Sequence, residues 1–281
     1  MLSNEERAKL KEIAKDLRLD IIDTMGYAGG AHVGGSMSMM DIMTVLYFKY
    51  LNVDPKNPQW EDRDRFILSK GHCALGYIPT LMKKGFMDKE GLKTFNHFKS
   101  PFGMHPDSNK IPGCDASSGS LGHGLPMAVG MAIGGKLQKK DFKVVVLLGD
   151  GECDEGSNWE ASMTANHYKL NNLIVIVDRN HFMIDGNTED VMKLEPLADK
   201  FAAFGYNVIK INGHDIDQID AALEKAWAAT DGPTLILADT IKGKTLGGAL
   251  EGKVVCHYCS LDSNQQKAAK ENIIKLYEEE K

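Results

Sequence analysis

Short apolar runs alternate with amphipathic segments along most of the chain. Mostly apolar residues fill positions 143–148 and 173–177, and shorter runs occupy 66–68, 207–211 and 234–238. A strand that is buried on both faces reads as a continuous apolar run, whereas a strand with one solvated face alternates apolar with polar residues. The runs therefore predict parallel strands in a sheet that is covered on both faces.

Helical periodicity fills the segments between and before these runs. In residues 5–25 and 38–51 apolar residues recur every three or four positions, which is typical of amphipathic helices, whereas residues 124–137 are rich in glycine and alanine. The predicted helices cover residues 5–25, 38–51, 124–137, 157–170, 216–229 and 263–281. No internal repeat, low-complexity tract or linker is visible, so we expect a single domain over residues 1–281, with N-terminal helices and a charged C-terminal helix. The predicted fold class is α/β, a doubly wound, mostly parallel sheet with helices on both faces.

Composition narrows the class of protein. The chain has 281 residues, 43% of them hydrophobic and 26% charged, as expected for a globular enzyme with a substantial core. A net charge of −6 disfavours binding to nucleic acid or to an anionic membrane. The charged N-terminus lacks an apolar signal region, and 5 cysteines without framework spacing indicate a reducing compartment. We therefore expect a soluble, cytoplasmic protein.

Two polar side chains follow neighbouring predicted strands. Asp150 stands within Gly-Asp-Gly after the first strand, and Asn180 ends the second. The carboxyl ends of parallel strands face one crevice, where ligands bind. Carboxylate and amide oxygens suit Mg²⁺ or Ca²⁺, and the flanking Gly149 and Gly151 let backbone N–H groups approach a diphosphate. Taken alone, these residues would form only a turn and a cap; in this order and spacing they predict a metal–diphosphate site.

The whole unit from 149 to 180, GDGECDEGSNWEASMTANHYKLNNLIVIVDRN, resembles the thiamine diphosphate signature of transketolases. Further similar motifs follow the family's order and together cover most of residues 10–245. They are AHVGGSMS (31–38), RDRFILSKGHCALGY (63–77), MHPD (104–107) and GSLGHGLPMAVGMA (119–132). The chain thus resembles the diphosphate-binding part of a transketolase.

The resemblance implies a set of cofactor ligands. Side-chain oxygens of Asp150 and Asn180 and the backbone carbonyl of Phe182 would hold Mg²⁺ or Ca²⁺, with Lys70 close to the diphosphate. The residues that would bind thiamine diphosphate are His72, Gly119, Ser120, Leu121, Gly149, Asp150, Gly151, Glu155, Asn180 and Lys242.

It also implies catalytic residues. His32, His72, His105 and His257 match histidines that line the channel to the thiazolium carbon, where they would bind ketose hydroxyls and shuttle protons near neutral pH. Glu160 matches an acid at the subunit interface that links two cofactors through a buried acid network, as does the cofactor-binding candidate Glu155. The alternative is that both glutamates are helix N-terminal acids favoured by the macrodipole.

One segment departs from the family pattern. Where transketolases carry His-Gly followed by Ala-Pro or Pro-Leu, this chain has Cys256-His257-Tyr258-Cys259. The alignment of His257 is open for that reason, and the substrate rim is expected to differ. The Cys-x-x-Cys pair could indicate zinc or redox chemistry, but a zinc site needs four ligands. We interpret the two cysteines as ordinary thiols.

The resemblance implies an incomplete catalytic site. In transketolases a second, pyrimidine-binding domain supplies the glutamate that activates the cofactor, and a complete enzyme needs about twice this length. We expect a separate C-terminal subunit to carry that domain, in an α2β2 heterotetramer. The expected activity is transfer of a two-carbon ketol unit from a ketose to an aldose, both sugar phosphates or similar anionic sugars.

Alternatives within and outside this enzyme class remain. The chain could belong to a deoxyxylulose-phosphate synthase-like or E1α-like thiamine enzyme, although E1α-like chains are not expected to carry SKGH and GSLGHG together. It could also be a non-catalytic partner that binds cofactor or a second chain. A nicotinamide site is disfavoured, because residues 119–124 do not match GxGxxG and no strand precedes them.

Overall fold

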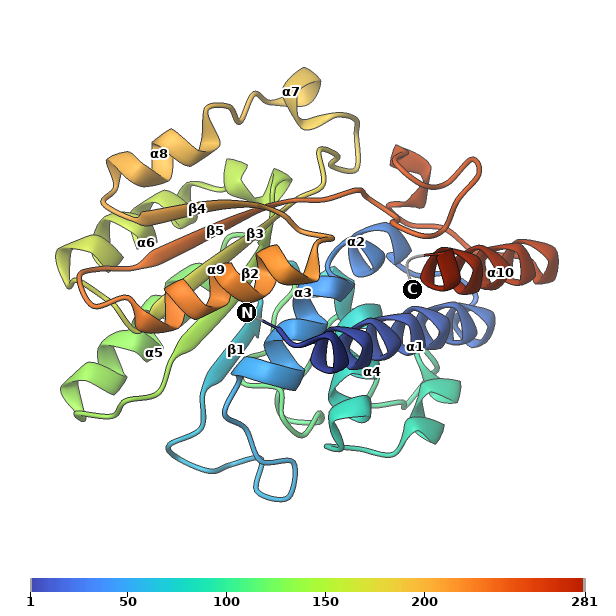
Figure 1. Cartoon of the computed structure of the whole chain (residues 1–281), viewed down its shortest axis with the longest axis horizontal. Coiled ribbons are helices and arrows are strands. Elements are labelled where there is room, and N and C mark those ends of the chain that lie inside the picture. Colours follow the sequence, from blue (N-terminus) through green and yellow to red (C-terminus); the bar gives the residue numbers. More distant parts are fainter. Residues whose placement is uncertain (1, 280–281) are drawn as a thin grey trace.

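The sheet is parallel throughout, as the apolar runs predict. The structure is a computed structural model that describes residues 2–279 (Figure 1). Its strands pair in the order β1-β2-β3-β5-β4, and every pairing is parallel. The strands are β1 (Arg65–Leu68), β2 (Val144–Gly149), β3 (Leu173–Arg179), β4 (Asn207–Asn212) and β5 (Thr234–Asp239). Gly149 pairs with Asp178, so β2 and β3 end level with each other.

Helices cover both faces of the sheet (Figure 1). They are α1 (Asn4–Ala28), α2 (Val33–Ser38), α3 (Met40–Val45), α4 (Ala74–Lys84), α5 (Gly124–Leu137), α6 (Gly156–His167), α7 (Thr188–Val191), α8 (Leu197–Ala203), α9 (Ile216–Ala228) and α10 (Ser263–Glu279). Short 3-10 turns at Gly71–Cys73, Lys89–Thr94, Gly151–Asp154 and Val254–Cys256 and a π turn at Leu46–Tyr50 complete the order. No helix within residues 2–279 is both long and apolar enough to cross a bilayer.

Alternate residues of each strand enter two separate cores. Val145 and Leu147 of β2 pack with residues of α1, α3, α4 and α9, whereas Val144 and Val146 pack with residues of α5, α6 and α8. Successive side chains of a strand point to opposite faces, so a fully apolar strand is what two covered faces require. The doubly wound interpretation of the apolar runs is correct for this reason.

The structure differs from the helical predictions in two ways. The expected helix at 38–51 is divided into the end of α2, α3 and the π turn Leu46–Tyr50. The short helices α7 and α8 are absent from the sequence-based elements, and so is the longer helix α4. Its residues from Ala74 to Met82 are all buried, so it offers no polar face from which a helical period could be recognised.

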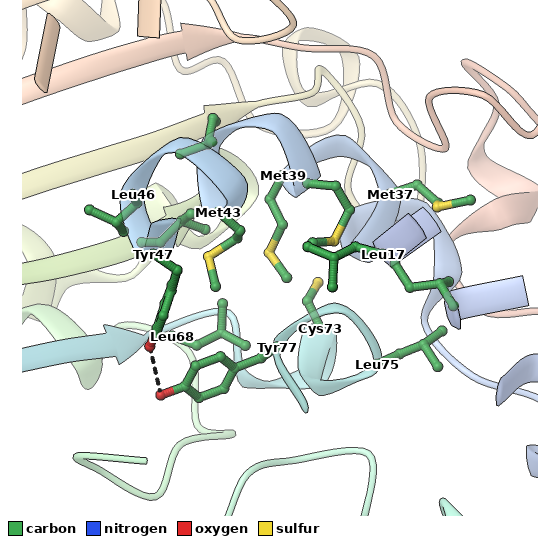
Figure 2. Close-up of a cluster of buried hydrophobic side chains, with 14 of the residues drawn as sticks. Leu17, Met37, Met39, Met43, Leu46, Tyr47, Leu68, Cys73, Leu75 and Tyr77 are labelled. Atoms are coloured by element: carbon green, nitrogen blue, oxygen red, sulfur yellow. Dashed lines mark hydrogen bonds between the residues drawn. The ribbon is translucent and has the colours of Figure 1, made fainter. Parts of the chain in front are cut away.

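The core next to α4 supports the segment that carries His72. Figure 2 shows Met39, Met43 and Cys73 packed between the segment of α3 and that of α4. The hydroxyls of Tyr47 and Tyr77 lie 3.3 Å apart within the same cluster. Cys73 is fully buried, which fixes the backbone immediately after His72.

A buried ion cluster ties the N-terminal helices to the sheet. Two nitrogens of Arg18 donate to the two carboxylate oxygens of Asp41 at 2.9 and 2.7 Å. His214, which follows β4, lies with its Nδ1 2.9 Å from Asp41 Oδ2, and its Nε2 accepts from the backbone N–H of Ile241 at 2.9 Å. Although burial would raise it, Arg18 and His214 hold the pKa of Asp41 well below its usual range.

Candidate active site

A cavity of about 380 Å³ opens at the carboxyl edge of the sheet. All five strands run in the same direction, so the segments that follow β1, β2, β3 and β5 meet there. The cavity is lined by His32, Gly35, Lys70, His72, His105, Gly119, Leu121, Gly149, Asp150, Gly151, Glu152, Asp154, Asn180, Phe182, Met183, Ile184, Lys242 and His257. Most of the residues that the sequence motifs single out therefore share one hollow.

Asp150 and Asn180 lie side by side at the ends of β2 and β3. Asp150 is 1% exposed, and its Oδ2 accepts from Arg179 Nη1 at 3.0 Å and from the His181 N–H at 2.6 Å. Burial and the nearby Asp178 carboxylate raise the pKa of Asp150, and the Arg179 guanidinium opposes that rise. The carboxylate is thus held in a fixed orientation next to the cavity.

The donor set fits a hard divalent cation with a diphosphate. The Asp150 carboxylate, the Asn180 amide oxygen and the Phe182 carbonyl would all offer oxygen atoms, which Mg²⁺ and Ca²⁺ prefer as ligands. The backbone at Gly151 stands close to Met183, because an added Cβ at Gly151 would lie only 3.1 Å from Met183 Cβ. Glycine at this position therefore lets the segment of Met183 pack closely, and the Gly151 N–H donates to Asp150 Oδ1 at 2.9 Å.

Lys242 is a buried cation in contact with this donor set. It is 2% exposed, and its Nζ donates to the Phe182 carbonyl at 2.9 Å and contacts His257 Nδ1 at 2.9 Å. Burial lowers the pKa of Lys242. No carboxylate among residues 2–279 forms an ion pair with Lys242, so an anion entering the cavity would balance its charge.

The ammonium of Lys70 is already paired within the protein. Its Nζ forms a buried ion pair with Asp178 and donates to the Gly35 carbonyl at 2.7 Å. Asp178 also accepts hydrogen bonds from the hydroxyls of Ser38, at 2.5 Å, and Thr240. Although burial would raise it, the Lys70 ammonium holds the pKa of Asp178 below its ordinary value. The pair anchors the ends of β1 and β3 beside the cavity.

Glu152 joins three segments that form the cavity floor. Its carboxylate accepts from the backbone N–H groups of Gly122 and Gly149 at 2.9 and 3.0 Å, and from the Ser69 hydroxyl. The same hydroxyl accepts from the N–H of Gly124, the first residue of α5, at 3.1 Å. Sequence reasoning missed Glu152 and Asp178, although each stands two residues from a chosen ligand, because only the folded chain shows that both are buried.

The four predicted histidines gather on one side of the cavity. The ring centroid of His32 lies 5.0 Å from that of His72, 6.4 Å from His105 and 5.4 Å from His257. His257 stacks on His72 at 5.4 Å with an interplanar angle of 21°, which places it within the group despite its unusual sequence context. The Nδ1 of His32 is buried and has no hydrogen-bond partner among residues 2–279.

Their protonation differs from the sequence expectation. Burial, aided by neighbouring cationic groups, lowers the pKa of His32 and His72 to about 4 and that of His257 to about 3. Burial also lowers the pKa of His105. These shifts disagree with titration near neutrality for His32, His72 and His257, which are half-buried, uncharged at pH 7 and able to act as neutral hydrogen-bonding groups.

Three predicted site residues do not line the cavity. Ser120, Glu155 and Glu160 are exposed in this chain. Glu155 is the residue before α6 and packs against Gly122, where an added Cβ would lie 2.6 Å from Glu155 Cβ. Glu160 lies on the exposed surface of α6. The interface roles of both glutamates stay predictions.

The Cys-x-x-Cys segment shows no metal geometry. Within residues 2–279, no three or more His, Cys, Asp or Glu side chains are grouped so that they could hold a metal ion. Cys256 is fully buried, and Cys259 pairs through its backbone with Ala31. Burial raises the pKa of both thiols, which is typical of unreactive cysteines.

The residues and their arrangement agree with comparisons to known proteins. Residues 9–275 match the family described as transketolase, thiamine diphosphate binding domain. The chain belongs to the transketolase family. Its fold matches the crystal structure of transketolase from Campylobacter jejuni subsp. jejuni, with a TM-score of 0.88 and 35% sequence identity over 94% of this chain and 42% of that one. The predicted α/β diphosphate-domain fold is confirmed.

Relatives of similar length are named as transketolase subunits. The chain is 40% identical over 266 residues to a 6-deoxy-6-sulfo-D-fructose transketolase subunit from Clostridium sp. (strain MSTE9), covering 95% of this chain and 96% of the relative. It is also 40% identical to one of the apulose-4-phosphate transketolase subunits, from Phocaeicola vulgatus, over 86% of this chain and 85% of the relative. It spans less than half the length of the solved transketolases that it matches. The prediction of a subunit-type, thiamine diphosphate-dependent transketolase is confirmed at the level of the family.

Proposed function

We propose that the chain is the diphosphate-binding subunit of a two-subunit transketolase, which transfers a two-carbon ketol unit from an anionic ketose to an aldose. The observation that carries this proposal is the single cavity in which an oxygen donor set faces a group of neutral histidines. Thiamine diphosphate, when bound, supplies a nucleophilic carbon and an electron sink. The chain's own residues would bind the cofactor and orient the sugar.

Asp150, Asn180 and the Phe182 carbonyl would hold Mg²⁺, with Ca²⁺ as a substitute. His72, Lys242 and the backbone at Gly151 would bind the diphosphate. The segment at 119–121, whose Gly119 and Leu121 line the cavity, would approach the aminopyrimidine through its backbone. Lys70 would act indirectly, since its charge is already paired with Asp178.

The histidines would handle the sugar. His32, His72 and His257 are neutral at pH 7, so each ring nitrogen is either a donor or an acceptor with a fixed tautomer. Lys242 Nζ donates to Nδ1 of His257, which leaves Nε2 of that ring as the site of the proton. The rings would hold the ketose hydroxyls and pass a proton between hydroxyl oxygens during bond cleavage.

A separate C-terminal subunit would supply the pyrimidine domain, in an α2β2 heterotetramer. Two relatives of similar length carry the word subunit in their names, and solved transketolases are more than twice as long as this chain. Helix α5 offers an interface, because Gly130 and Gly134 have no atom within 4 Å of an added Cβ. Met163 on α6 is 56% exposed nearby, and Glu160 shares that helix. The free cysteines agree with a cytoplasmic location.

The substrates would be ketoses and aldoses with a phosphate or another anionic group. One relative is named for 6-deoxy-6-sulfo-D-fructose and another for apulose 4-phosphate. Of the two cavity lysines, Lys70 is paired with Asp178 and Lys242 would be used by the diphosphate. The distal anion would therefore be bound mainly by the partner chain. A non-catalytic role is the alternative, and the complete donor set and histidine group disfavour it.

The test is a calorimetric titration of thiamine diphosphate with Mg²⁺ into the chain alone and into the chain mixed with its partner, with ketol transfer assayed in parallel. Cofactor binding and activity in the mixture support the proposal. Asp150→Ala should abolish both, whereas Asp190→Ala, at an exposed aspartate of α7, should change neither. A mixture that binds the cofactor without transferring a ketol unit would favour the non-catalytic alternative.

A further inference from the structure

Tyr258 is the residue at which the chain departs from the His-Gly pattern, and its backbone is held in place beside the cavity. Ala31 and Cys259 exchange two backbone hydrogen bonds, at 3.1 and 3.2 Å. The preceding Cys256 is fully buried, and its sulfur lies 2.6 Å from the position of an added Cβ at Gly34. The backbone of Tyr258 is therefore held on both sides and cannot swing away from the segment that carries His32.

The tyrosine ring packs behind a cavity histidine. It meets the His32 ring edge-on, with centroids 5.0 Å apart and an interplanar angle of 72°. Its hydroxyl lies over Gly30, where an added Cβ would come within 3.0 Å of the oxygen, so a larger residue at position 30 would displace the phenol. His32 lines the cavity, whereas Tyr258 does not and is 49% exposed. Tyr258 thus stands at the rim, on the solvent side of His32.

The phenol is an uncommitted polar group at this rim. Its hydroxyl makes no hydrogen bond to any residue between 2 and 279. The two lysines of the cavity, in contrast, already have partners. Lys70 is paired with Asp178, and Lys242 donates to a backbone carbonyl and contacts His257. A sugar whose reacting end lies among the cavity histidines would present its other end to the rim. There the phenol can donate a hydrogen bond.

We propose that Tyr258 determines donor specificity: its hydroxyl donates a hydrogen bond to an oxygen at the distal end of the bound ketose, and its ring holds His32 in place. The ligand class is a ketose with a strong acceptor at that end, a phosphate or a sulfonate oxygen. A glycine, as in the family pattern, would supply neither the ring nor the donor. This inference rests on the proposed ketol transfer and adds a substrate contact to it.

The test uses the complex of this chain with its partner, loaded with thiamine diphosphate and Mg²⁺, and two donors that differ in the distal group. D-fructose 6-phosphate carries a phosphate and 6-deoxy-6-sulfo-D-fructose a sulfonate. Tyr258→Phe keeps the ring and removes the donor, so it should raise KM for at least one ketose about two- to ten-fold with little change in kcat. Tyr258→Gly removes both, so it should also lower kcat.

A matched control is available at the opposite edge of the sheet. Tyr168 is 54% exposed and meets the His167 ring edge-on at 4.9 Å, after the last turn of α6. Tyr168→Phe should leave KM and kcat unchanged. Calorimetry should give the same cofactor affinity for both Phe variants as for the wild type, which excludes an effect through the cofactor site.

The outcomes distinguish the specificity role of Tyr258 from the proposed ketol transfer. If the wild type transfers ketol units and Tyr258→Phe has an unchanged KM for both donors, or loses cofactor affinity instead, the specificity role is wrong and the proposed function stands. If the wild-type complex transfers no ketol unit from either donor or from other ketose phosphates, the proposed function fails, and the role of Tyr258 fails with it. A KM increase confined to one donor supports the role and identifies the preferred distal group.

Discussion

Removal of the Lys70 ammonium would test how the carboxyl edge of the sheet is held together. Lys70 and Asp178 form an ion pair in which the residues are 1% and 0% exposed. Lys70→Met keeps a long apolar side chain and removes the charge, so it leaves the Asp178 carboxylate buried without its counter-ion. Breaking a buried pair in this way costs about 3–5 kcal/mol.

The structure places the expected cost near the lower end of that range. The hydroxyls of Ser38 and Thr240 still donate to Asp178 and partly replace the lost ammonium. We therefore expect the free energy of unfolding to fall by about 3 kcal/mol. In a urea titration with an m value of about 3 kcal/mol/M, the midpoint would fall by about 1 M. Cofactor affinity should also fall, because the end of β3 carries Asn180.

A matched variant controls for the substitution itself. Lys83→Met removes an ammonium that lies 2.6 Å from Asp16 Oδ2, in a pair whose side chains are 35% and 37% exposed. Water screens such a pair, so the loss should be at most about 1 kcal/mol. Adding Asp178→Asn to Lys70→Met should recover part of the stability. Equal midpoint shifts for the two single variants would refute the reasoning.

Lys70→Met should also reverse the way in which the contribution of Asp178 to stability depends on pH. In the wild type the folded pKa of Asp178 is lowered, so its contribution to stability is present above the unfolded pKa of about 3.8 and is lost as the pH falls through the folded value. Without Lys70, burial dominates and the folded pKa lies above the unfolded one. The variant should then regain stability, relative to the wild type, as the pH is lowered through the raised folded pKa. Urea titrations at several pH values would measure the difference.

Four further variants test other parts of the structure. Gly124→Ala should destabilise the chain by about 1–3 kcal/mol, because an added Cβ would lie 2.2 Å from a buried serine hydroxyl. Gly130→Ala on the same helix, with nothing within 4 Å, should stabilise it by about 0.5–1 kcal/mol in thermal or urea unfolding. Asp41→Asn removes a carboxylate whose folded pKa is lowered, so stability at pH 7 should fall and the loss of stability below about pH 4 should become less steep. Arg179→Gln removes the guanidinium that orients Asp150, and Mg²⁺ titrations should show a metal affinity about 10–100-fold weaker, whereas an unchanged affinity would mean that the backbone alone positions the carboxylate.

Local patterns were sufficient for the strands and for most helices. The predicted strand at 173–177 lies within Leu173–Arg179, and the predicted helix at 124–137 coincides with Gly124–Leu137. The strand follows from its continuous apolar run and the helix from its run of small and apolar residues, and both features depend only on near neighbours in the chain. Helix α4 was not predicted, because burial on all sides leaves it without the polar face by which an amphipathic helix is recognised.

The sequence by itself determined the family, the parallel sheet and the positions of Asp150 and Asn180, because motif order and strand ends are local features of the chain. Only the tertiary structure decided which polar groups become buried and what they meet. It pairs Lys70 with Asp178, 108 positions apart, and brings His257 against His72. It also shifts the histidines to neutral forms and leaves Glu160 on the surface. Burial and charge proximity depend on contacts between distant segments, and no local pattern encodes them.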